Sequence, residues 1–178
     1  RQMCIRDRLS YLVLGGKCSA CGAPISVRYP VVEAVTAILW VLCGLQFGVG
    51  NALTGAMLLT AVLVVLTAID LDHQLLPDSL TLPLLWIGLL LNIDNTFVAL
   101  KSAVLGAVFG YLSLWAVFLL FKIITGKEGM GHGDFKLLAA LGAWFGLAAL
   151  PTIVLLSSVV GAVIGVVLIV SGKQDREM

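Results

Sequence analysis

Six runs of apolar residues occupy most of this chain, at about 31–49, 52–69, 79–95, 99–122, 135–149 and 151–170. An α-helix of about 20 residues, rising 1.5 Å per residue, crosses a hydrocarbon core about 30 Å thick. Of the 178 residues 60% are hydrophobic and only 12% charged, and a soluble protein of that size cannot bury so much apolar surface. The sequence therefore predicts an all-α fold, a polytopic transmembrane bundle of about six helices behind a short N-terminal segment.

Small and polar residues refine this helix prediction. Gly106 with Gly110, and Gly161 with Gly165, have the small-xxx-small spacing that lets two helices approach closely. Both pairs are therefore expected at helix contacts. Ser79 opens the third run and is a suitable N-cap for its helix.

The distribution of Lys and Arg predicts the orientation of the bundle. With six spans, both termini and the loops at 70–78 and 123–134 lie on one side of the membrane. That side holds ten of the eleven basic residues: Arg1, Arg6, Arg8, Lys17, Arg28, Lys122, Lys127, Lys136, Lys173 and Arg176. The other side holds only Lys101, so the positive-inside rule makes the ten-charge side cytoplasmic.

Two aspartates at the cytoplasmic ends of these runs are candidate catalytic residues. Asp70 ends the second run, and Asp134 precedes the fifth, 64 residues later. Carboxylates are expensive in a membrane and tend to be kept there for function. Two that share a proton can hydrolyse a peptide bond, because like charges a few ångströms apart raise the pKa of one of them. Gly131 and Gly133 would leave room for a substrate backbone and permit unusual backbone angles.

The other acidic and imidazole side chains have ordinary explanations. Asp72, Asp78 and Asp94 are expected to be helix caps or solvated loop residues. His73 and His132 stand alone, without the spacing of metal ligands, and are expected in loops.

Cys18 and Cys21 form a CxxC pair on the predicted cytoplasmic side. Such a pair is typical of half a zinc site or of a redox pair rather than of a structural disulfide. A tetrahedral zinc site needs four ligands, and the remaining two cysteines are poorly placed, Cys4 near the N-terminus and Cys43 inside a span. The pair therefore supplies at most half of a zinc site.

Four stretches of the sequence together resemble one enzyme family. They are GGKCSAC at 15–21, RYPVVE at 28–33, IDLDHQLLPD at 69–78 and TGKEGMGHGDFKLL at 125–138. The chain resembles, from about residue 9 to residue 170, the bacterial type IV prepilin peptidases, also called prepilin leader peptidase/N-methyltransferases. These belong to the GxGD class of intramembrane aspartyl proteases.

The resemblance implies roles for individual residues. Asp70, seven residues before Pro77, would be the first catalytic aspartate and Asp134 the second. Lys136 would orient Asp134 or screen its charge, or serve only as a positive-inside anchor. The residues that would shape the site are Asp72, Pro77, Glu128, Gly131, Gly133 and Lys136.

The resemblance also implies a reaction. The family cleaves the basic leader of prepilins and of type II secretion pseudopilins after a Gly and before a residue that is usually Phe. Cleavage takes place at the cytoplasmic face of the bacterial inner membrane and needs no cofactor. Many members then methylate the new N-terminus with S-adenosylmethionine, and the full-length enzyme can also bind zinc.

The motifs and the resemblance divide the chain into four segments. Residues 1–8 are expected to be foreign sequence, 9–30 the remnant of a cytoplasmic CxxC-containing loop, 31–170 the transmembrane peptidase domain and 171–178 a cytoplasmic tail. The family's earlier transmembrane helix, its first CxxC and its final helical segment have no counterpart here. The chain is therefore expected to be a fragment of a longer enzyme.

Two other functions remain open at this point. Buried carboxylates also serve as proton relays in membrane transporters, although these often carry the charge near the bilayer midplane and show internal repeats. An inactive fragment or assembly component is the second alternative. Nucleic acid is excluded as a partner, because no basic patch with interleaved aromatic residues is present. The expected partners are the pilin precursors and membrane lipid, and the oligomeric state is not predicted.

Overall fold

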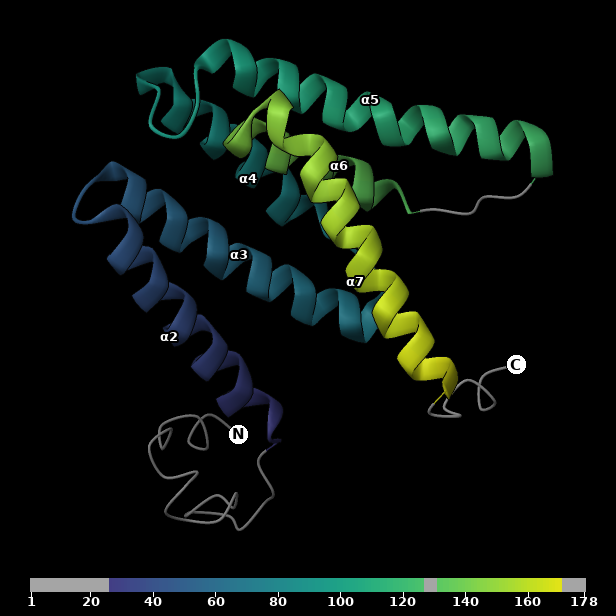
Figure 1. Ribbon diagram of the computed structural model, residues 1–178, viewed down its shortest axis with the longest axis horizontal. Helices are drawn as coiled ribbons and strands as arrows, with labels where there is room; N and C mark the ends of the chain where they lie inside the picture. The colour runs from purple at the N-terminus through teal and green to yellow at the C-terminus, as the bar shows by residue number, and fades with distance from the viewer. Residues whose placement is uncertain (1–25, 127–130, 171–178) are drawn as a thin grey trace. The chain divides into compact units, whose positions relative to one another are not determined.

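The computed structural model describes residues 26–126 and 131–170, with side chains placed up to residue 167 (Figure 1). Cys18, Cys21 and Glu128 lie outside these residues, as do the predicted segments 1–8 and 171–178 and most of the predicted loop 9–30. All secondary-structure elements of the described residues are helices, as predicted. Its elements are α2 (Arg28–Phe47), α3 (Asn51–His73), α4 (Asp78–Leu91), η1 (Asn92–Asp94), α5 (Leu100–Thr125), α6 (His132–Phe145), η2 (Leu147–Ala149) and α7 (Leu150–Val170).

Four segments of the described chain are long and apolar enough to cross a membrane: Arg28–Phe47, Asn51–His73, Leu100–Thr125 and Leu147–Val167. The other two helices, α4 and α6, have 14 residues each, which is about 21 Å of helix. All six predicted helices are therefore present, but these two are shorter than the sequence indicated. In each case a short 3₁₀ turn follows the helix and takes up part of the apolar run.

The chain forms two compact units, one up to Ala68 and the other from Ile69 onward. In the first unit, α2 and α3 are joined by a turn at 48–50 and form a helical hairpin (Figure 1). The Trp40 indole N–H donates to the Met57 carbonyl at 3.1 Å, and Arg28 Nη2 donates to the Ala68 carbonyl at 2.5 Å. One bond lies near the open end of the hairpin and the other in the half nearer the turn.

In the second unit, α4 and α6 lie side by side and run in the same direction. Lys136, in the first turns of α6, pairs with Asp78 at the start of α4. At the other end, Asn92 Nδ2 donates to the carbonyls of Ala143 (2.8 Å) and Trp144 (3.3 Å). The starts of α4 and α6 therefore share one end of the unit.

Asn92 is fully buried, and its side-chain amide is satisfied on both sides. Besides its two donated bonds, its Oδ1 accepts the N–H groups of Phe97 (3.0 Å) and Val98 (3.1 Å). A buried amide with several good partners stabilises the structure, whereas each partner left unpaired would cost about 1–3 kcal/mol. Asn92 thus holds the turn after α4 against the end of α6.

The closest helix contact is the crossing of α5 and α6. A Cβ on Gly106 would meet the Gly142 carbonyl oxygen, and a Cβ on Gly142 would meet that of Gly106. One turn along, a Cβ on Gly110 would lie 2.8 Å from the Leu138 carbonyl oxygen. The prediction that Gly106 and Gly110 mark a helix contact is confirmed.

Two finer helix predictions are wrong. Ser79 is not a cap, because α4 begins at Asp78 with Pro77 as its N-cap and no side-chain cap bond. The Pro77 carbonyl already accepts the N–H groups of Leu80 and Thr81, so the helix begins one residue earlier. A Cβ on Gly161 or Gly165 would meet nothing within 4 Å among the described residues, so no helix packs on that pair there.

Candidate active site

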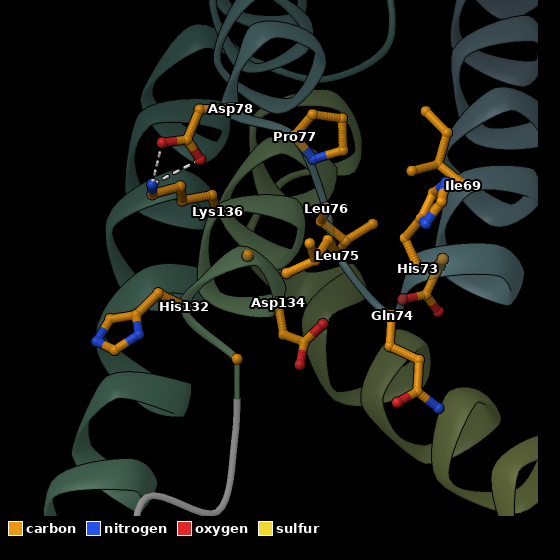
Figure 2. A pocket seen from close by; sticks show the side chains of 13 residues that line it. Ile69, His73, Gln74, Leu75, Leu76, Pro77, Asp78, His132, Asp134 and Lys136 are labelled. Carbon is orange, nitrogen blue, oxygen red and sulfur yellow. Dashed lines mark hydrogen bonds and ion pairs between the residues drawn. The ribbon is translucent and has the colours of Figure 1, made fainter.

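A pocket of about 990 Å³ opens at the end of the second unit where α4 and α6 begin. Its walls are residues 69–70, 73–78, 131–134 and 136, and Figure 2 shows their side chains. The first stretch runs from the last turn of α3 to the start of α4, and the second is the start of α6. The two motifs that stand out in the sequence thus form one pocket.

Asp70 and Asp134 both line this pocket. Asp70 lies in the last turn of α3 and Asp134 in the first turn of α6. Asp134 lies outside the four candidate spans. The atoms around it exclude part of the solvent and raise the pKa of its carboxyl, and the negative charge of Asp70 raises it further. The pocket therefore holds two carboxyl groups, one of which retains its proton to a higher pH than an ordinary aspartate.

Asp72 does not line the pocket, although the sequence placed it among the residues that shape the site. Two residues along an α-helix turn the side chain by about 200°, so Asp70 and Asp72 face different sides of α3. This geometry agrees with the choice of Asp70 over Asp72 as the candidate catalytic residue.

The two glycines beside Asp134 serve different purposes. Gly133 is helical, and a Cβ there would lie 2.7 Å from the Cβ of Leu76. Gly131 has an extended backbone (φ −72°, ψ 140°), and a Cβ there would meet only an Asp134 carboxylate oxygen, at 4.0 Å. Neither needs the unusual backbone angles that the sequence suggested. Gly133 permits close packing of the 74–77 segment, and Gly131 leaves open space beside Asp134.

Lys136 binds a different carboxylate from the one expected. Its Nζ lies 2.6 Å from both side-chain oxygens of Asp78 (Figure 2). Asp78 is therefore an ion-pair partner and not simply a cap or a solvated loop residue. No hydrogen bond joins Lys136 to Asp134 in the described part of the chain.

The two histidines lie at helix ends rather than in loops. His73 is the last residue of α3 and His132 the first of α6, and both line the pocket. The His132 ring contacts Phe118 and Phe135, with ring centroids 5.3 Å and 5.7 Å away. Residues 26–126 and 131–170 contain no group of three His, Cys, Asp or Glu side chains that could hold a metal.

Sequence reasoning gave no role to Gln74, which also lines the pocket. It ends α3 with a left-handed backbone (φ 51°), and its N–H donates to the Asp70 carbonyl at 2.8 Å. Left-handed helix ends usually carry Gly or Asn, so a glutamine gave no sequence signal for this turn.

Two family models match this chain. The model of the type IV leader peptidase family matches residues 57–166, which include both aspartates and every pocket residue. The chain belongs to the type IV leader peptidase family. The bacterial peptidase A24 N-terminal domain matches residues 8–47. Family membership and the four apolar helices make the chain an integral membrane protein.

Curated relatives named prepilin leader peptidase/N-methyltransferase are similar over most of this chain. The protein from Aeromonas hydrophila is 60% identical over 161 residues, and that from Pseudomonas aeruginosa 57% identical over 161 residues. The Neisseria gonorrhoeae protein is 53% identical over 160 residues. Each match covers 90% of this chain and 56% of the relative, so the chain spans little more than half of their length. No solved structure matches the chain significantly.

Proposed function

We propose that this chain carries the peptidase site of a membrane-embedded aspartyl endopeptidase that removes the leader of type IV prepilins and type II secretion pseudopilins. The observation that carries the proposal is the placement of Asp70 and Asp134 in one pocket at the ends of two helices. The names of the relatives supply the substrate class. Cleavage after the leader's Gly, at the cytoplasmic face of the bacterial inner membrane, agrees with the ten-to-one bias of basic residues.

The raised pKa of Asp134 gives the two carboxyl groups different roles in this reaction. Asp70, as the carboxylate, takes a proton from a water molecule whose oxygen attacks the carbonyl carbon. Asp134 gives its proton to the carbonyl oxygen, which forms a tetrahedral diol. When the C–N bond breaks, Asp70 passes its proton to the leaving nitrogen and Asp134 regains one from a hydroxyl of the diol. Both residues end as they began.

Residues around the dyad formed by Asp70 and Asp134 support this chemistry. The open space at Gly131 lets an extended substrate backbone approach Asp134, because no side chain stands between them. Ile69, Leu75 and Leu76 give the pocket an apolar part of its lining, which suits the Phe that usually follows the cleaved Gly. Lys136 acts indirectly, because its ion pair with Asp78 fixes the start of α6, and Asp134 lies in the first turn of that helix.

Methylation and zinc binding belong to the longer protein in this proposal. The name of the relatives, prepilin leader peptidase/N-methyltransferase, supports N-methylation with S-adenosylmethionine. The described residues contain no zinc cluster, and Cys18 and Cys21 lie outside them, so no step of the cleavage is assigned to a metal. Likewise, no pocket residue is assigned to the methyl donor.

A cleavage assay in membranes tests the proposal. A prepilin with a basic leader ending in Gly-Phe should be cut after the Gly by the wild-type protein. Asp70→Asn and Asp134→Asn should each abolish cleavage, because a dyad acts as a unit. Asp94→Asn, a carboxylate in η1 outside the pocket, is the matched control and should cleave normally.

Other outcomes of the same assay would overturn the proposal. Cleavage that persists in either dyad mutant would show that the wrong acids were chosen. Absence of cleavage by the wild type, together with ion-dependent solute uptake into vesicles, would favour the proton-coupled transporter instead.

A further inference from the structure

The backbone of Gln74 is unusual for its residue type. Positive φ occurs at five described residues, and three of them are the glycines Gly48, Gly126 and Gly146. The fourth is Asn95, and asparagine is one of the few side chains that enter the left-handed region readily. Gln74 is the exception, because its longer side chain brings no such compensation. The turn alone would favour Gly or Asn, so the backbone does not account for a glutamine at this position.

The side chain of Gln74 lies in the pocket with the two aspartates. Figure 2 shows it with Asp134 toward one end of the pocket, away from the pair formed by Asp78 and Lys136. Gln74 is exposed, and no hydrogen bond from its amide to another described residue is present. Among the residues that line the pocket it is the one uncharged amide. Its hydrogen-bonding groups are thus available to a ligand.

We propose that Gln74 binds the main chain of the substrate beside the scissile bond, an inference that rests on the proposed peptidase function. A primary amide presents both a donor and an acceptor, which complement the C=O and N–H of an extended peptide. Its Nε2–H donates to a substrate carbonyl, and its Oε1 accepts a substrate N–H.

The position of Gln74 also relates the bound substrate to the chemistry. The Gln74 N–H bond to the Asp70 carbonyl, at 2.8 Å, places both residues in the same helical turn. A peptide held by Gln74 is therefore held in a fixed register relative to the Asp70 carboxylate. Because the contacts are to main-chain groups, they suit many leader sequences, and the strained turn presents a side chain that glycine could not supply.

Gln74→Gly separates this role from a structural one. Glycine relieves the left-handed strain, so the thermal unfolding midpoint should stay the same or rise. The loss of the amide should raise KM for prepilin roughly tenfold, the effect of about one or two hydrogen bonds, while kcat changes little. Asn95→Gly makes the same backbone change outside the pocket and should leave both constants unchanged.

A second variant tests the amide without added backbone freedom. Gln74→Met keeps the length and volume of the side chain and removes both hydrogen-bonding groups, so it should raise KM to a similar extent. Unchanged KM in a folded Gln74→Gly or Gln74→Met protein would overturn this inference. It would leave the proposed peptidase function standing, because the wild type would still cleave. An equal rise in Asn95→Gly would also overturn it, by showing that a flexible turn is enough. Absence of cleavage by the wild type would remove the proposed function and this inference together.

Discussion

The ammonium group of Lys136 lies 2.6 Å from both carboxylate oxygens of Asp78, and this ion pair joins the first turns of α6 and α4 beside the pocket. The side chain of Lys136 is 27% exposed and that of Asp78 56% exposed, so water screens the pair. The pair therefore contributes little to the free energy of unfolding, and its main effect is to fix the start of α6.

A double-mutant cycle measures the strength of this pair. With Lys136→Met, Asp78→Asn and the combined variant, we expect a coupling free energy of unfolding of about 0.2–1 kcal/mol, because partly exposed pairs are worth no more. Thermal unfolding in detergent at low ionic strength gives the values, and added salt should reduce the coupling. A coupling of zero at low salt would mean that the two groups do not interact in solution.

The stability of the protein should depend on pH through Asp134. Its pKa is raised in the folded state, so the folded protein holds this proton more tightly than the unfolded chain does. The resulting stabilisation is present at low pH and is lost as pH rises through the raised folded pKa. Asp134→Asn removes a negative charge that is partly shielded from solvent and repelled by Asp70, so it should raise the unfolding midpoint at pH 7 relative to wild type. At a pH below the ordinary value of 3.8 that gain should vanish. Equal unfolding midpoints of wild type and Asp134→Asn at both pH values would contradict the expectation.

The charge of Asp70 should be detectable in the titration of Asp134. Asp70→Asn removes the like charge, so the pKa of Asp134 should fall toward its ordinary value. The fall should be partial, because exclusion of solvent is the larger cause and remains. A ¹³C NMR titration of labelled Asp134 gives the measurement. Asp94→Asn serves as the control, and an identical titration of Asp134 in both variants would show that the two acids are too far apart to interact.

The crossing of α5 and α6 should tolerate no side chain. Gly142→Ala places a methyl group against the Gly106 backbone, which has no flexible atom to move aside, and should destabilise the protein by about 1–3 kcal/mol or more. Gly161→Ala is the matched control, since a Cβ there meets no described atom. It should be neutral or stabilising by up to about 1 kcal/mol, the difference in helix propensity. Thermal unfolding compares the two, and similar effects would show that α5 and α6 pack differently.

The helices of this fold could be predicted from the sequence because lipid-facing segments are apolar over their whole length. The lengths of α4 and α6 could not, because the apolar run continues through the 3₁₀ turns that follow each of them. Hydropathy does not distinguish a helix from such a turn. It also does not show which small pairs meet a neighbour, and of the two predicted glycine pairs only Gly106 and Gly110 do so among the residues that the structure describes.

For the site, the sequence was sufficient to select Asp70 and Asp134, since charge at the end of an apolar run is costly and therefore conspicuous. Their catalytic role stays a prediction. The partner of Lys136 was not predictable, because the choice between Asp78 and Asp134 depends on how α4 and α6 align. The need for Gly133 likewise depends on Leu76, a residue 57 positions earlier in the sequence, and so appears only in the folded chain.

The glycine crossing also limits how far one wall of the pocket can move. At Gly106 and Gly142 backbone meets backbone, so α6 cannot slide along α5 without a steric clash. The bonds of Asn92 and Lys136 tie α4 to the same helix at both ends. The helices α4, α5 and α6 therefore form one rigid scaffold, and Asp134 keeps a fixed position relative to all three, whatever occupies the pocket.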